Sequence, residues 1–95
     1  MLKIYKGTQY DDLTISVPEN ITVTDVRLFH PETKEYAPMT NYEGNKWMLT
    51  KEQTADLPTG VYSLEIYAGD TMYCSMEKFA SVMDSSKFYT EVWQN

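Results

Sequence analysis

Cysteine and histidine are nearly absent, with only Cys74 and His30 in 95 residues. A single cysteine cannot form a disulfide within the chain, which excludes the cross-sheet bridge of an antibody domain. Zinc sites need several such ligands. A Ser/His/Asp or Cys/His catalytic set would need His30, which we expect to end a strand just before Pro31, at the start of an exposed loop. We therefore expect no enzymatic activity, no metal site and no cofactor.

Basic residues are also scarce. Eight Lys and Arg against 14 Asp and Glu give a formal net charge of −6, and the basic residues form no stripe. This argues against binding to nucleic acid or to an anionic membrane. The apolar runs are too short to span a membrane. Because the strand pattern begins directly at Leu2, without an apolar signal segment, we expect assembly in the cytoplasm.

The side chains that could still support chemistry have structural explanations. None of the acidic residues falls in the apolar phase of a predicted strand, so we expect their carboxylates to be solvated. Cys74 alternates in phase with Met72 and Met76, and we expect it to be buried on the inner face of a sheet.

The dominant pattern in the sequence is a period of two in apolar residues, which is typical of strands with one buried face. Turn-forming residues separate these runs at short intervals, as in a β-sandwich of about seven strands. The apolar runs that carry the pattern lie in residues 2–5, 13–17, 21–30, 46–50, 62–67 and 72–77.

A corner motif precedes one of these strands. Leu57, Gly60 and Tyr62 have the spacing of a tyrosine corner, in which the Tyr hydroxyl bonds back to the preceding connection. We therefore predict that Tyr62 is buried, with its hydroxyl bonded to backbone within residues 56–60. The predicted fold is all-β: an antiparallel, immunoglobulin-like sandwich over residues 1–83, followed by a C-terminal tail (residues 84–95).

Two segments could be helical. Residues 51–56 could form one turn. In the C-terminal tail, apolar residues four positions apart fit a helix, and the same residues also fit an extended arm. We expect residues 86–93 of the tail to dock on a neighbouring subunit, and the alternative is that this segment folds back on its own domain or frays. The candidate interface residues are Phe88, Tyr89, Val92 and Trp93.

Other aromatic residues lie on the strand phase opposite the predicted core. Aromatic side chains facing outward from several strands favour either a protein interface or a sugar-stacking surface. They are Tyr5, Phe29, Tyr67 and Tyr73.

The order of these features resembles that of small immunoglobulin-like modules in virion proteins of tailed phages. The matching segments are the strand entry at 13–14, the strand at 26–29 with its turn through Lys34, the corner at 57–62 and the hairpin at 69–70. The resemblance implies a non-enzymatic virion protein, either capsid-decorating or a tail or baseplate component, assembled in the bacterial host cytoplasm. Its partners would be other virion structural proteins or further copies of itself. The alternative is a carbohydrate-binding or adhesion module that uses the exposed aromatic residues.

Overall fold

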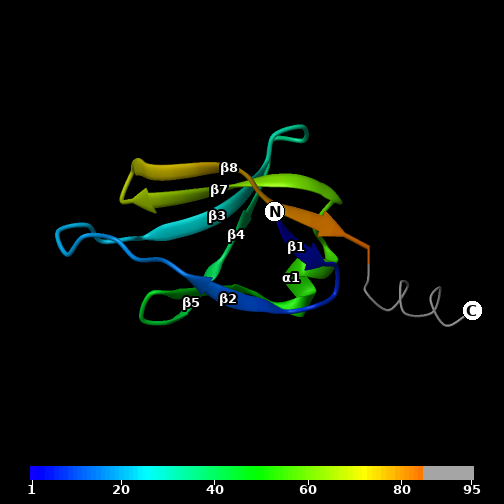
Figure 1. Ribbon diagram of the computed structural model, residues 1–95, viewed down its shortest axis with the longest axis horizontal. Helices are drawn as coiled ribbons and strands as arrows, with labels where there is room; N and C mark the ends of the chain where they lie inside the picture. The colour runs from blue at the N-terminus through cyan, green and yellow to red at the C-terminus, as the bar shows by residue number, and fades with distance from the viewer. Residues whose placement is uncertain (85–95) are drawn as a thin grey trace, which may run out of the picture.

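A computed structural model describes residues 1–84 (Figure 1). Strands make up 58% of this part of the chain and helix only 6%, so the predicted all-β class is confirmed. In chain order the elements are β1 (Leu2–Tyr5), β2 (Tyr10–Thr14), β3 (Asp25–His30), β4 (Glu35–Pro38), β5 (Thr40–Glu43), β6 (Lys46–Leu49), α1 (Lys51–Ala55), β7 (Gly60–Ala68) and β8 (Thr71–Met83).

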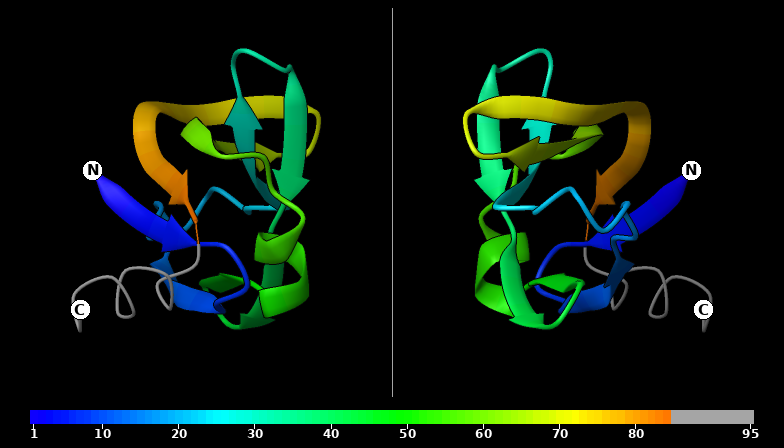
Figure 2. Two further views of the ribbon diagram at one scale, coloured as in Figure 1. Left: turned by 90° about the vertical axis from the view of Figure 1, so that its right-hand side faces the viewer. Right: turned by 90° about the vertical axis from the view of Figure 1, so that its left-hand side faces the viewer.

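The strands form two sheets of unequal width. The five-stranded sheet has the order β1-β8-β7-β3-β4, and the three-stranded sheet has the order β2-β6-β5. The two sheets lie in separate layers (Figure 2). One strand pair departs from the predicted antiparallel arrangement, because β1 runs parallel to β8, with Leu2 opposite Ala80 and Tyr5 opposite Met83.

The period of two in the sequence places one face of each sheet in a shared core. On β7, Tyr62, Leu64 and Ile66 point inward, and Leu64 and Ile66 lie opposite Leu28 and Val26 of β3. Burying each such side chain contributes about 1.5–3 kcal/mol. The remaining buried apolar residues come from both sheets and their connections: Ile4, Ile15, Ala37, Met39, Trp47, Leu49, Leu57, Ala80 and Val82.

Strand β8 is longer and less regular than the sequence pattern predicts. Its pairing with β7 shifts register between Tyr62 and Leu64, and Lys78 has a φ of 53° at this point. Such bulges bend a strand and increase its twist, and β8 turns through a wide bend in Figure 2. The bulge divides β8 into a first part, Thr71–Phe79, and a second part, Ala80–Met83, that pairs with β1.

The predicted helical turn at 51–56 forms as α1. Thr50 and Gln53 make a capping box, in which each side chain accepts a hydrogen bond from the other's backbone N–H. The fully buried Thr54 hydroxyl donates to the Thr8 carbonyl at 2.8 Å and accepts from the Gly7 N–H at 3.1 Å. These bonds hold α1 against the turn between β1 and β2.

The hydrogen bond predicted for the corner is confirmed. Tyr62 is 2% exposed, and its hydroxyl donates to the Pro58 carbonyl at 2.6 Å. Leu57 is buried beside it in the core. Burial, with a smaller contribution from the Glu35 carboxylate, raises the pKa of Tyr62 to about 12. The corner therefore fixes the start of β7 to the end of the connection that follows α1.

Replacing Tyr62→Phe should lower the free energy of unfolding by about 0.5–1.5 kcal/mol, because one buried hydrogen bond is lost while the ring remains. Chemical denaturation followed by fluorescence measures this change. Tyr73→Phe is the matched control, since Tyr73 is exposed and its replacement should leave stability nearly unchanged. Equal stability of Tyr62→Phe and the natural chain would contradict the importance of the corner bond.

Candidate interaction site

The first part of β8 exposes side chains that were expected to be covered. Met72 and Met76 are 44% and 48% exposed, and Cys74 is only partly buried. Cys74 was predicted to be buried, and the structure shows it only partly buried. Its side chain packs against the core. For Cys74 and Met76 the cause is the unequal width of the sheets, because the three-stranded sheet does not close over this part of β8. Met72 is exposed because a register shift places it opposite Tyr67, on the outer face.

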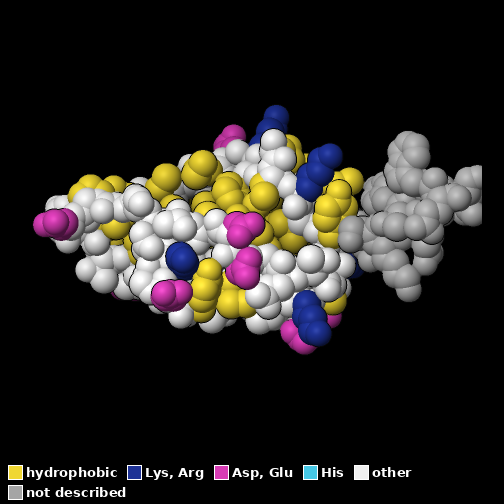
Figure 3. All heavy atoms as spheres, turned by 60° about the horizontal axis from the view of Figure 1, so that its bottom comes forward, with side chains coloured by type: hydrophobic (Ala, Val, Ile, Leu, Met, Phe, Trp, Pro, Cys, Tyr) yellow, Lys and Arg dark blue, Asp and Glu magenta, His cyan; other side chains and the backbone are white. Residues whose placement is uncertain are grey.

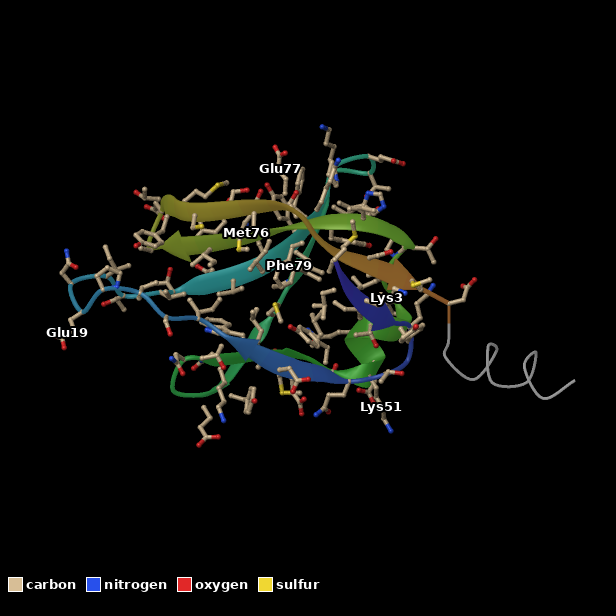
Figure 4. The ribbon with its side chains drawn as sticks, in the orientation of Figure 1. Lys3, Glu19, Lys51, Met76, Glu77 and Phe79 are labelled. Atoms are coloured by element: carbon tan, nitrogen blue, oxygen red, sulfur yellow. The ribbon has the colours of Figure 1, made fainter. Side chains whose placement is uncertain are left out.

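An open cleft lies between β8 and residues 13–17, which form the end of β2 and the segment that follows it. We call it the β2–β8 cleft; it has a volume of about 340 Å³. Met76 and Phe79 extend from β8 on the side of β2 (Figure 4). Apolar side chains are exposed across the side that carries β2, with charged side chains scattered around them (Figure 3). The apolar lining residues are Leu13, Ile15, Val17, Leu64, Ile66, Tyr73, Cys74, Met76 and Phe79.

Two strand edges border this cleft. On the side away from β7, β8 pairs with β1 only through Ala80–Met83, so the edge of Thr71–Phe79 has no strand partner within residues 1–84. Strand β2 pairs with β6 on one side, and its other edge is likewise unpaired in the described part of the chain. Unpaired edges present backbone donors and acceptors to an incoming chain.

The opposite face of the five-stranded sheet carries the aromatic residues predicted to face outward from β3 and β7. The Arg27 guanidinium lies 4.2 Å from the ring centroid of Tyr67 and 5.0 Å from that of Tyr36. Phe29 packs against Tyr36 with 4.8 Å between ring centroids. Tyr73 was expected on this face and instead lines the β2–β8 cleft, because the β7–β8 register shifts between Ile66 and Tyr67.

Glu65 overturns the expectation that the carboxylates are solvated. It lies on β7 opposite Arg27 and is only 6% exposed. The Tyr67 hydroxyl donates to its Oε1 at 2.9 Å, and this bond, more than burial, raises the pKa of Tyr67. With Phe29 and Ser63 it lines a groove of about 490 Å³ on the outer face of the five-stranded sheet, which we call the outer groove.

The burial of Glu65 could not be read from its alternation with Leu64 and Ile66, which places it on the solvent phase of β7. It is covered because long side chains of neighbouring strands lie over the same face. The signal available in the sequence was indirect: Arg27 and Glu65 carry opposite charges, and they become cross-strand neighbours only in the observed register.

His30 ends β3 just before Pro31, as predicted, but it is buried and not exposed at the start of the loop. It is 4% exposed and packs edge-on against Tyr62, with 4.8 Å between ring centroids. Its Nδ1 accepts from the Thr33 N–H at 3.4 Å, and Nε2 lies 3.3 Å from the Thr59 carbonyl. A neutral ring protonated at Nε2 satisfies both contacts. His30 ends β3 with its ring turned into the structure, and these backbone contacts give it a structural role.

The candidate interface residues of the C-terminal tail, Phe88, Tyr89, Val92 and Trp93, lie outside the described residues. Within residues 1–84, no three His, Cys, Asp or Glu side chains gather closely enough to hold a metal ion. No helix in the same range is long and apolar enough to cross a membrane.

Comparisons with protein-family models, with curated proteins and with solved structures found no match to this chain.

The close packing of His30 on Gly60 yields a prediction. Gly60 has a φ of 138°, and a Cβ there would lie 2.7 Å from His30 Nε2. Gly60→Ala should therefore reduce the free energy of unfolding by about 1–3 kcal/mol, from backbone strain together with the clash. His30→Ala removes the clash but not the strain, so the double variant should lose less stability than the two single variants added together.

Denaturation of the four chains of this cycle measures the coupling between the two positions. Gly69→Ala is the control, because Gly69 has a φ of 65° and open space where its Cβ would lie. It should carry backbone strain alone and show no coupling to His30→Ala. Additive effects of Gly60→Ala and His30→Ala would contradict the packing described here.

Proposed function

We propose that this chain is a small immunoglobulin-like module without catalytic activity, which acts through protein–protein contacts in a phage particle. Strand order supports the immunoglobulin-like assignment. If β2 to β8 correspond to strands B, C, C′, D, E, F and G, the three-stranded sheet is B-E-D and the other sheet contains G-F-C-C′. The Tyr62 corner then falls at the start of strand F, after the E–F connection that contains α1.

The observation that carries the proposed function is the β2–β8 cleft. It opens beside core residues Leu64 and Ile66, and Met76 at its border is almost half exposed. Each square ångström of apolar surface covered by a partner contributes about 25 cal/mol. Clefts lined mainly by apolar side chains are common binding sites. An open, apolar cleft between two sheets suits a protein partner that inserts side chains between them.

The location in a virion rests on the resemblance of the sequence to phage modules. We propose that the chain either decorates the capsid or joins tail or baseplate components, with other virion structural proteins as partners. Its gene would then lie beside capsid or tail genes. Neighbouring genes for polysaccharide use would instead favour the carbohydrate-binding alternative.

Met76→Asp should remove the chain from assembled particles, because it puts a charge on the border of the apolar cleft. The measurement is immunoblotting of gradient-purified particles made with each variant. Met72→Asp is the matched control: Met72 is similarly exposed on the same strand but does not line the cleft, and this variant should be incorporated normally. Equal incorporation of both variants, or absence of the natural chain from particles, would contradict the proposal.

A second candidate function is favoured by the outer groove. Phe29 offers a ring, and Glu65 and Ser63 offer oxygen atoms, in a space of about 490 Å³. Aromatic faces combined with a few fixed polar groups are the usual composition of small-molecule sites, and they would suit a sugar. The function would then be carbohydrate binding or adhesion.

NMR titration of the ¹⁵N-labelled chain with bacterial surface oligosaccharides tests this alternative. Saturable shifts at the amides of β3 and β7 that disappear in Phe29→Ala, and persist in Met76→Asp, would support it. Titrations that leave these amides unchanged, or shifts that Phe29→Ala preserves, would count against it.

A further inference from the structure

We propose that the β2–β8 cleft binds the C-terminal tail of a second copy of this chain, so that the module self-associates by exchange of tails. The inference rests on the proposed function as an assembly module, and it names the occupant of the cleft. Three observations support it: the apolar cleft with its unpaired strand edges, the composition and length of residues 85–95, and the place where β8 ends.

The cleft requires an apolar and extended occupant. Its lining combines Leu13 and Ile15 from one sheet layer with Cys74, Met76 and Phe79 from the other. The free edge of β8 along Thr71–Phe79 offers backbone groups beside it. A chain laid in an extended form can pair with such an edge and place alternate side chains inward. The length of this free edge is about 30 Å at about 3.3 Å per residue.

The tail has the composition and length to fill this site. Phe88 and Val92 alternate with Tyr89, Glu91 and Trp93, so either face of an extended segment presents apolar side chains. Residues 85–95 can span at most about 36–40 Å, which exceeds the length of the free edge. Each aromatic side chain buried in the cleft would remove about 150–250 Å² from water.

The end of β8 favours a second copy over the same chain. Met83 lies opposite Tyr5, so β1 already occupies the edge of β8 over Ala80–Met83. A tail that turned back along the edge of its own β8 would meet β1 before it reached the free edge at Phe79. A tail from another copy meets no such obstacle, and two copies can exchange tails reciprocally, as in domain swapping.

Sedimentation of the full chain over a range of concentrations tests self-association. We expect the natural chain to associate, and Met76→Asp in the cleft to weaken the association by at least about tenfold. The double variant Phe88→Ser/Trp93→Ser in the tail should weaken it similarly. Met72→Asp and Lys87→Ser are the matched controls outside the cleft and beside Phe88, and both should associate as the natural chain does.

Mixing the two defective chains separates exchange between copies from docking within one copy. The Met76→Asp chain retains a normal tail, and the Phe88→Ser/Trp93→Ser chain retains a normal cleft. Each should sediment as a monomer alone, and the mixture should form a 1:1 complex. If the tail docks within its own chain, the mixture forms no complex and Phe88→Ser/Trp93→Ser lowers the melting temperature of the monomer, which overturns the inference.

A natural chain that stays monomeric at all concentrations would also overturn it, as would association that Met76→Asp leaves intact. Failure here is distinguishable from failure of the proposed function. A monomeric chain whose incorporation into particles depends on Met76 keeps the assembly function with another occupant in the cleft. A self-associating chain that is absent from particles keeps the exchange of tails and loses the virion assignment.

Discussion

A three-stranded sheet cannot cover a five-stranded sheet, and most of what is distinctive in this molecule depends on that mismatch. Strands in a sheet lie about 4.8 Å apart, so two missing strands leave roughly 10 Å of the wider sheet without a facing layer. At β1 and the second part of β8 the gap is closed, and Ile4, Ala80 and Val82 are buried. At the first part of β8 it stays open, and Met76 is exposed although it points to the same layer. Strand β8 therefore lies in the core over its second part and at the surface over its first part.

The boundary between the two parts of β8 is fixed by contacts on the side of Ala80–Met83, where the core is closed. The bulge at Lys78 lets β8 bend, while Tyr62 lies opposite Ala80 just beyond it. Tyr62 is in turn fixed by its bond to Pro58 and by the edge of His30. Gly60 admits the His30 ring because it has no side chain. The corner bond, the bulge and the pairing of β8 with β1 lie next to one another, so specific contacts define where β8 leaves the core and the cleft opens.

Features that depend only on residues close together in the sequence were predicted correctly from local patterns. Alternation on β7 identified Tyr62, Leu64 and Ile66 as core residues, and the Leu57-x-x-Gly60-x-Tyr62 spacing identified the corner bond. The predictions that were wrong concern residues whose burial depends on contacts between strands far apart in the sequence. Cys74 and Met76 have the inward phase but lack a facing strand, and a register shift moved Tyr73 into the cleft. Glu65 was expected in solvent and His30 at the end of a strand before an exposed loop, and both are buried by residues that only the three-dimensional fold brings close to them.

The β2–β8 cleft and the outer groove differ in the ligands that they can recognise. This difference favours one of the two proposed functions over the other. The outer groove already satisfies part of its polar chemistry internally, because the Tyr67 hydroxyl donates to the carboxylate of Glu65, which lines the groove. A sugar would have to compete with Tyr67 for the Glu65 oxygen, and an exchanged hydrogen bond brings little net gain. The cleft holds apolar surface that has no partner within residues 1–84, and covering it removes that surface from water without breaking an existing bond. For this reason we favour contact with a protein segment at the cleft over binding of a glycan at the outer groove.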